Sequence, residues 1–223
     1  MPIHISGTGS FLPQNKVNNS SFSNRVFFDK DGNRYPNSND EIIEKFKTIT
    51  GIKERRYADK EHKTSDLATF AAQNAIKDAG IDKESLDYII VAHNFGDIEY
   101  GTNQYIALPS VATMVKHKLE IQNENCVAYD IIFGCPGWLE GVIQATAYIR
   151  SKMAKRCLVI GADTLSRTID ESDRDSMIFA DGAGATIIEE TSKSGGILSH
   201  KTITKAGKEA LYLFCEPSYD PKN

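Results

Sequence analysis

The sequence predicts a layered α/β fold with parallel strands, because short apolar segments alternate with helical patterns along the chain. Two segments, 86–92 and 157–162, are almost continuously apolar, which is typical of strands buried on both faces of a sheet. Helical patterns between them cover about 104–119 and the segment from Pro136 to about Ser151. This strand-helix-strand order favours parallel strands joined by helices that cover the sheet.

Local signals place the N-terminal elements. Residues 3–9 alternate apolar and polar side chains and end in a glycine turn, which predicts a short strand. Residues 14–40 are polar and rich in Asn and Ser, and 29–33 reads as a loop or hairpin tip. Glycines that act as C-terminal stops support two predicted helices, 40–49 ended by Gly51 and 65–79 ended by Gly80.

The later elements follow in the same way. A strand is predicted at 126–130, and Pro109 is expected to limit or kink the helix before it. After a charged loop at 165–177, we expect 181–185 to form a tight structural turn that leads into a strand at 186–189. Residues 195–223 are expected to begin with a strand, followed by an apolar patch and a polar tail.

Composition narrows the classes of protein. Of 223 residues, 26 are Lys or Arg and 30 are Asp or Glu, which gives a net charge of −4 without a basic run. A nucleic-acid-binding protein would carry a basic patch or stripe. No segment approaches the roughly 18 apolar residues of a membrane span. The N-terminus lacks the basic start and apolar run of a signal peptide, so we expect a cytoplasmic protein.

The chain has four cysteines, of which Cys135 stands out by its context. It lies where a strand and loop turn into a helix, with Pro136 at the expected first helical position. The free amides at such a helix start favour an anion, here a thiolate. Gly134, Gly137 and Gly141 permit a sharp turn and close packing of a helix that is apolar all round, so this helix is expected to be buried. Cys135 is therefore a candidate nucleophile, and a small buried residue is the alternative.

The other cysteines give no such signal. Cys126, Cys157 and Cys215 lie in apolar segments and are expected in the core. No CxxC motif and no His pair at metal-ligand spacing occur, so neither zinc nor a thioredoxin-like dithiol is expected.

An ordered set of motifs resembles the ketoacyl-acyl-carrier-protein synthase III family of thiolase-fold condensing enzymes. Together these motifs are specific, although each alone is weak. They run from Ile3 to about Glu189 and comprise 7–13 (GTGSFLP), 50–56 (TGIKERR), 64–68 (TSDLA), 79–81 (AGI), Asp130 with Cys135 and Gly137, 158–162 (LVIGA), Asp173 with Arg174, and 179–185 (FADGAGA).

The resemblance implies a fold and a reaction. The fold would be thiolase-like, with α-β-α layers, a mixed and mostly parallel sheet and a buried central helix that starts at the nucleophile. Cys135 would take an acyl group from a thioester primer, delivered by acyl-CoA or acyl-carrier protein. Malonyl-acyl-carrier protein would then lose CO2, and its carbanion would attack the acyl-cysteine in a Claisen condensation of fatty acid or related biosynthesis. The backbone N–H of Cys135 would be one oxyanion donor. No cofactor is implied, and the family forms homodimers.

The chain departs from the family pattern in length. In the family, a His and an Asn of a second, repeated half bind the malonyl thioester, and neither is found here. We therefore expect a thiolase-like domain over 1–190, the start of an incomplete C-terminal half over 191–223, and no complete condensation by the chain alone. His93, at the end of a predicted strand, does not match the family motif, and an exposed or hydrogen-bonded structural role is favoured.

Three further residues are candidates for substrate binding. Arg174 matches an arginine that contacts the nucleotide of CoA in the family, but Lys45 and Ile49 replace the family's Trp and Arg, which favours a larger or carrier-borne primer. Leu108 lies in a segment that resembles the family's dimer-contact loop and would alter the floor of the acyl pocket. Trp138 is bulkier than the family's usual residue beside the cysteine, and packing is its alternative role.

Two other functions stay open. The chain could be a non-catalytic partner subunit or truncated homologue that contributes an interface or pocket. A redox-responsive thiol at Cys135 is a third hypothesis, which would require an accessible thiol and a resolving cysteine.

Overall fold

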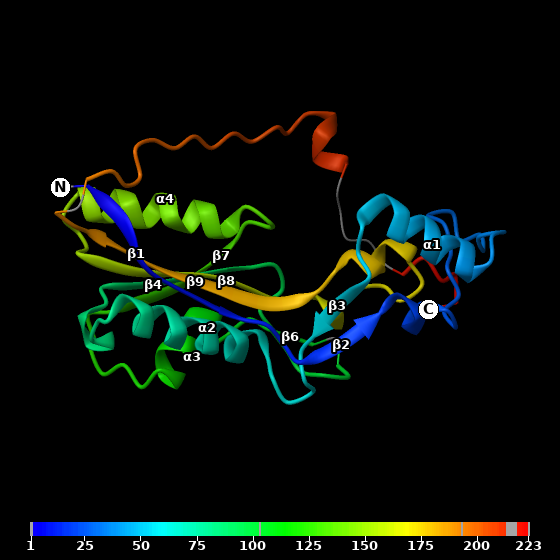
Figure 1. The fold of residues 1–223 in the computed structure, drawn as a ribbon, viewed down its shortest axis with the longest axis horizontal. Coiled ribbons are helices and arrows are strands. Elements are labelled where there is room, and N and C mark those ends of the chain that lie inside the picture. Colours follow the sequence, from blue (N-terminus) through cyan, green and yellow to red (C-terminus); the bar gives the residue numbers. More distant parts are fainter. Residues whose placement is uncertain (1, 103, 193, 213–217, 223) are drawn as a thin grey trace.

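A five-stranded mixed sheet forms the centre of the fold, with helices on both of its faces (Figure 1). This computed structural model describes residues 2–102, 104–192, 194–212 and 218–222. The strands of the sheet, in spatial order, are β1 (Ile3–Phe11), β9 (Asp181–Glu190), β8 (Arg156–Thr164), β4 (Tyr88–His93) and β7 (Val127–Ile132).

Strand directions confirm a mixed, mostly parallel sheet. β4 pairs in parallel with both β7 and β8, whereas β9 is antiparallel to its two neighbours, β8 and β1. β9 therefore runs against the other strands of the sheet. The C-terminal ends of β4, β7 and β8 lie together at one edge, which is where sites form in open α/β sheets.

The helices form the outer layers and confirm the predicted α-β-α arrangement (Figure 1). α2 (Thr64–Ala79) and α3 (Val111–Lys118) cover one face, where they share a core with Val91 and Leu158. α4 (Gly137–Arg150) covers the other face and packs against Ile90 and Val159. Neighbouring side chains of a strand point to opposite faces, so Ile90 and Val91 serve different layers.

A smaller lobe lies at one end of the sheet (Figure 1). It contains β2 (Asn15–Asn18), the 3₁₀ turn Asn19–Phe22, α1 (Asn39–Thr50) and β3 (Glu54–Tyr57), and β2 pairs with β3. Its own core is made of Phe22, Phe27, Ile42, Phe46 and Met177. The predicted hairpin tip is confirmed, since the N–H of Gly32 donates to the carbonyl of Asp29 (2.9 Å) and Phe28 bridges to Arg34.

The predicted glycine stops are also confirmed. α1 and α2 end at Gly51 and Gly80, both in the left-handed conformation with φ of 72° and 64°. Only glycine adopts this conformation at little cost, and the backbone N–H of each of these glycines donates to a carbonyl of the last helical turn. In the described part of the chain, no helix is long and apolar enough to cross a membrane.

The prediction of a helix over 104–119 is wrong in its first half. Residues Tyr105–Ile106 form β6, which pairs with β5 (Asp97–Ile98). α3 begins only after Pro109, where the hydroxyl of Ser110 accepts the N–H of Thr113 (3.1 Å) as an N-cap. The apolar spacing at 104–110 is compatible with a helix, but strand pairing and the cap at Ser110 set the boundary.

Two further predictions are wrong. Residues 181–185 are not a tight turn but the first half of β9, where they pair with β1 and β8. In the described part of 195–223, no strand forms. Instead, the backbone from Ile197 to Thr202 follows α4, with the Arg150 guanidinium donating to the Ile197 carbonyl (3.1 Å) and the Thr202 hydroxyl donating to Glu140 (3.0 Å).

α4 is not buried all round as expected. Gly141, Val142, Ala145 and Ile149 face the sheet and are buried, whereas Leu139 on the outer side is 51% exposed. The helix is apolar on both sides, but in the described residues the sheet covers only one of them.

Candidate active site

The turn between β7 and α4 carries Cys135, which is exposed. The other described cysteines, Cys126 and Cys157, are buried as predicted, and Cys215 lies outside the described residues. Burial raises the pKa of Cys126 to about 11 and that of Cys157 to about 12, so both are thiols at neutral pH. Cys135 is thus the described cysteine that a reagent can reach.

The start of α4 differs by one residue from the prediction. Pro136 is the N-cap rather than the first helical residue, and the helix begins at Gly137. The carbonyl of Pro136 accepts the N–H of Glu140 (3.1 Å), and the N–H of Gly137 donates to the carbonyl of Gly134 (3.0 Å). The N–H of Cys135 donates no hydrogen bond within the described part of the chain, so it is available to a ligand.

Glycines fix the path of this turn, as the sequence predicted. Gly134 has φ of 67°, a conformation that strains other residues. A Cβ on Gly137 would lie 2.8 Å from the Cβ of Ala92, and one on Gly141 would lie 2.7 Å from Val159 Cγ1. Both distances are too short for a methyl group. The glycines therefore let α4 approach β4 and β8, and its N-terminus lies at the C-terminal ends of these strands.

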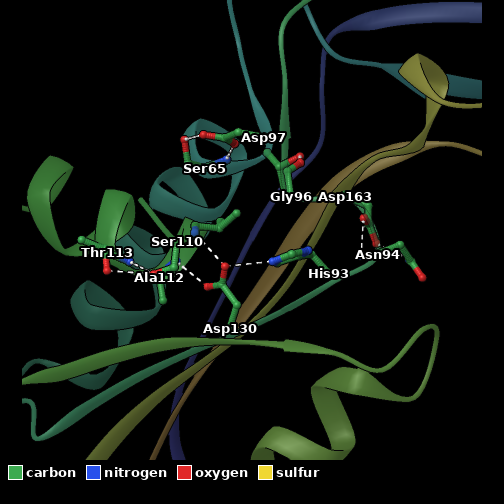
Figure 2. A network of polar contacts seen from close by, with 12 residues as sticks. Ser65, His93, Asn94, Gly96, Asp97, Ser110, Ala112, Thr113, Asp130 and Asp163 are labelled. Atoms are coloured by element: carbon green, nitrogen blue, oxygen red, sulfur yellow. Dashed lines mark hydrogen bonds and ion pairs between the residues drawn. The ribbon is translucent and has the colours of Figure 1, made fainter. Parts of the chain in front are cut away.

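A buried His93 and a half-buried Asp130 form a pair at the same edge (Figure 2). His93 Nε2 lies 3.0 Å from Asp130 Oδ2, and the His93 side chain is 1% exposed. The Asp130 carboxylate also accepts the N–H groups of Val111 (2.8 Å) and Ala112 (2.7 Å). The pair therefore joins β4 and β7 to the first turn of α3, and the hydrogen-bonded role favoured for His93 agrees with this geometry. His93 Nδ1 is buried without a partner among the described residues.

Asn94 and Asp163 form a second pair beside the first (Figure 2). The backbone N–H of Asn94 donates to Asp163 Oδ1 (2.9 Å), and its side-chain Nδ2 donates to Oδ2 (2.7 Å). Burial raises the pKa of Asp163 above its ordinary value, although the hydrogen bonds from Asn94 oppose this shift. Asn94 Oδ1 lies 3.8 Å from where a Cβ of Gly134 would be, so this pair adjoins the turn that carries Cys135.

Arg174 lies in the smaller lobe, at the start of a 3₁₀ turn whose N-cap is Asp173. Its guanidinium carbon is 4.6 Å from the centre of the Tyr35 ring, and Nε is 3.7 Å from Asp175 Oδ1. One face of the guanidinium is therefore covered by an aromatic ring from the 26–36 segment.

Trp138 and Leu108 occupy different environments. Trp138 points toward the sheet, where its Nε1–H donates to the Thr186 hydroxyl (3.2 Å). The Cβ of Trp138 lies 3.2 Å from the position that a Cβ on Gly161 would occupy. Leu108 is 84% exposed on the segment before α3. Within the described residues, no hydrogen bond or ion pair joins Cys135, Arg174, Trp138 and Leu108, which come from separate elements.

Sequence reasoning did not select Asn94, Asp163 or Tyr35. A signal existed for two of them, since Asn94 and Asp163 lie at the C-terminal ends of neighbouring parallel strands, β4 and β8, where polar side chains meet. The stacking of Tyr35 on Arg174 depends on how the 26–36 segment folds back, for which the local sequence gives no signal. The described residues contain no group of three or more His, Cys, Asp or Glu side chains that could hold a metal ion.

Comparison with known proteins agrees with this arrangement. The family model for 3-oxoacyl-[acyl-carrier-protein (ACP)] synthase III matches residues 129–206, which include the Cys135 turn. A beta-ketoacyl-[acyl-carrier-protein] synthase III of Neisseria meningitidis serogroup C is 42% identical over 196 residues, covering 87% of this chain and 54% of the relative. A protein of the same name from Staphylococcus haemolyticus is 37% identical over 215 residues, covering 96% of this chain and 61% of the relative.

The fold agrees as well. The crystal structure of 3-oxoacyl-[acyl-carrier-protein] synthase III from Aquifex aeolicus superposes with a TM-score of 0.70 at 33% identity, over 86% of this chain and 55% of that one. The chain thus spans little more than half the length of the relatives that it matches. Over that span, the chain belongs to the 3-oxoacyl-[acyl-carrier-protein] synthase III family and has its thiolase-like fold.

Proposed function

We propose that Cys135 is the acyl-accepting nucleophile of a 3-oxoacyl-[acyl-carrier-protein] synthase III-type condensing enzyme. The observation that carries this proposal is the placement of an exposed Cys135 in a glycine-fixed turn at the N-terminus of α4, while Cys126 and Cys157 are buried thiols. A helix N-terminus favours the thiolate, which is the reactive form of cysteine. The names of the relatives supply the reaction class.

The first half-reaction uses groups of this chain. The Cys135 thiolate attacks the carbonyl carbon of the primer thioester, and the C–S bond to the carrier thiol breaks as the tetrahedral intermediate collapses. Negative charge on the carbonyl oxygen needs hydrogen-bond donors, and the unused N–H of Cys135 is placed to be one. The products are the acyl-cysteine and the free carrier thiol, which takes up a proton.

The second half-reaction needs further groups. Malonyl-acyl-carrier protein loses CO2, and the carbanion attacks the acyl-cysteine carbonyl to give the 3-ketoacyl product and free Cys135. In the resembling family, a His and an Asn outside the span matched here promote this step. His93 is occupied by Asp130 on the α3 face, so it does not take that role in the proposal. We propose that this chain accepts the acyl group but does not condense it alone.

The stacking of Tyr35 on Arg174 supports a primer that is larger than acetyl-CoA or delivered by acyl-carrier protein. In the resembling family, the matching arginine contacts the CoA nucleotide, and here one of its faces is covered by Tyr35. The proposal needs no cofactor, because the thioester itself is the activated substrate. Acyl-carrier protein is the proposed partner.

A homodimer and the remaining site residues belong to the same proposal. β7 forms an edge of the sheet, with Val127 46% and Ile132 68% exposed, and such an edge can pair with a second copy. Leu108, exposed before α3, would then reach the partner's acyl pocket, and Trp138 would border the acyl group beside Cys135. Free cysteines support a reducing, cytoplasmic setting.

The proposed division of the chain is a thiolase-like domain over 1–190 and the beginning of a second half over 191–223. This is supported by the end of β9 at Glu190, after which the described backbone leaves the sheet and follows α4.

A two-stage assay tests the proposal. The chain is incubated with acyl-CoAs and acyl-carrier proteins, freed of excess thioester, and then given carboxyl-labelled malonyl-acyl-carrier protein. We expect protein-bound acyl groups in the first stage and no release of labelled CO2 in the second. Release of CO2 with transfer of the acyl group to malonyl-acyl-carrier protein would contradict the proposal that this chain does not condense the acyl group alone. Failure of every primer to bind covalently would favour the non-catalytic partner subunit.

A further inference from the structure

Two polar side chains at the end of β4 serve different sides of the sheet. His93 joins Asp130, whose carboxylate holds the first turn of α3. Asn94, the next residue, adjoins Gly134 in the turn that leads to α4. Figure 2 shows the Asn94–Asp163 pair beside the His93–Asp130 pair, and each pair has its own hydrogen bonds. The end of β4 thus supports α3 through one residue and the Cys135 turn through the other.

Asp163 fixes the orientation of the Asn94 amide. Asp163 Oδ1 accepts a hydrogen bond from the backbone N–H of Asn94 (2.9 Å), and Asp163 Oδ2 accepts one from its side-chain Nδ2 (2.7 Å). A flipped amide would set Oδ1 against a carboxylate oxygen, and two acceptors repel each other. The amide therefore keeps its N–H groups on Asp163 and its oxygen on the side of Gly134.

This orientation leaves Asn94 Oδ1 facing the turn. Oδ1 accepts no hydrogen bond among the described residues and lies 3.8 Å from the Cβ position of Gly134. Gly134 has φ of 67°, which glycine adopts at little cost, and this turn brings its backbone close to the Asn94 amide oxygen. Asn94 thus bonds to Asp163 through its N–H groups and presents a neutral amide oxygen toward the Cβ position of Gly134, the residue before Cys135.

We propose that Asn94 is a positioning residue for Cys135: with its amide fixed by Asp163, it supports the Gly134–Cys135 turn and keeps carboxylate charge away from the thiolate. This inference rests on the proposed function, because it assigns Asn94 to the site of the acyl-accepting cysteine. It requires no contact between Asn94 and substrate.

Swapping the two side chains separates charge from packing. Asn94→Asp places a carboxylate toward the turn, whereas Asp163→Asn removes the buried carboxyl group. The double variant Asn94→Asp/Asp163→Asn rebuilds an acid–amide pair at the same place but reverses which member faces Gly134. If Asn94 only packs at the end of β4, this exchange should restore the reactivity of Cys135. If Asn94 positions Cys135, the exchange should not restore it.

The measurement is the rate of Cys135 alkylation by iodoacetamide across pH, followed by intact mass. A carboxylate close to a thiol disfavours the thiolate, and one pK unit corresponds to a factor of ten. We expect Asn94→Asp and the double variant to slow alkylation about tenfold at neutral pH and to move the midpoint of the rate profile to higher pH. Asp163→Asn should leave the midpoint in place. A double variant that reacts like the unchanged protein would overturn the proposal.

His93→Gln is the matched control, since it alters the neighbouring residue of β4 on the α3 side. Its alkylation profile should keep the midpoint of the unchanged protein, even where urea unfolding shows lower stability. A shift equal to that of Asn94→Asp would overturn the proposal, because the effect would then come from loosening of the sheet edge. Asn94→Ser covers the case in which the charged variants do not fold: it should lower the maximal rate constant of single-turnover acylation with little change in the primer concentration at half-maximal rate, and an unchanged rate constant would overturn the proposal.

Alkylation needs no thioester, so the two proposals fail separately. If no primer acylates Cys135 but Asn94→Asp still moves the alkylation profile, the acyltransferase function is wrong and the positioning role of Asn94 stands. If primers acylate Cys135 but Asn94→Asp does not move the alkylation profile, the acyltransferase function stands and the positioning role of Asn94 is wrong.

Discussion

His93 Nε2 and Asp130 Oδ2 are 3.0 Å apart, and the same carboxylate accepts the N–H groups of Val111 and Ala112. One side chain on β7 thereby connects β4 with the start of α3. Because His93 is buried and these N–H groups belong to a first helical turn, removal of the carboxylate leaves donors without partners.

The variant Asp130→Ala is expected to lower the free energy of unfolding by about 2–4 kcal/mol, since it removes both an N-terminal helix contact and the partly buried hydrogen bond with His93. Urea unfolding followed by circular dichroism measures this loss. Asp31→Ala, in an exposed loop, is the control and should change stability by less than about 0.5 kcal/mol. Equal unfolding midpoints for the two variants would show that Asp130 does not hold α3.

Gly137→Ala should disturb the Cys135 turn. The added Cβ would lie 2.8 Å from the Cβ of Ala92, so α4 must shift at its N-terminus. Overpacking of this kind costs about 1–3 kcal/mol, and the rate of acylation should fall with it.

Gly184→Ala provides the comparison for this prediction, because a Cβ there meets no atom within 4 Å. Stability and acylation rate should stay close to those of the unchanged protein. If Gly137→Ala behaves like Gly184→Ala in both assays, close approach of α4 to β4 does not matter for the site.

Tyr35→Ala should change the preference between primers. The ring covers one face of the Arg174 guanidinium at 4.6 Å, and a contact of this type at a partly exposed site contributes about 0.5–1 kcal/mol. Removing it frees that face for a nucleotide, so the acyl-CoA concentration at half-maximal rate of single-turnover acylation should fall about two- to fivefold relative to that of acyl-carrier protein. Phe28→Ala, in the same lobe, tests for general loosening. An equal fall in this half-maximal concentration for both carriers would argue against a role of Tyr35 in primer choice.

Asp163 should make stability depend on pH in the acidic range. Its pKa in the folded protein is raised, mainly by burial, above the ordinary value of 3.8. The folded state therefore holds this proton more tightly than the unfolded chain. As pH rises from 3.8 through the folded pKa, the contribution of Asp163 to the free energy of unfolding falls. Asp163→Asn removes this group, so the stability difference between the two proteins should change across that window and be constant above it. Parallel stability curves for both proteins from about pH 4 to neutral pH would contradict the raised pKa.

Much of the fold was predictable from the sequence. The buried strands, the glycine stops of α1 and α2 and the layer order follow from apolar periodicity and capping residues, which are local signals. The strand residues 181–185 were not, because pairing with β1, which is distant in the chain, and with β8 decided them. The start of α3 at Val111 was missed because the short β5–β6 pairing and the cap at Ser110 decided it rather than the helical spacing. The exposure of Leu139 on α4 was missed because a helix that is apolar on both sides does not reveal which side is covered.

The site was predictable only in part. Cys135 was found because proline and glycines around a cysteine mark a helix start, a pattern that lies within a few residues. Asn94 and Asp163 are 69 positions apart in the chain, and only the parallel pairing of β4 and β8 brings them together. Tyr35 reaches Arg174 through the fold of the smaller lobe.

The central claim is that Cys135 carries the acyl group, and intact mass spectrometry tests it most directly. The chain and its Cys135→Ala variant are incubated in parallel with acyl-CoAs and acyl-carrier proteins, and any adduct is located by peptide mapping. The account predicts a mass gain equal to one acyl group on the unchanged chain, located at Cys135, and none on the variant. An equal gain on Cys135→Ala, or no gain with any primer while Cys135 is still alkylated by iodoacetamide, would contradict it.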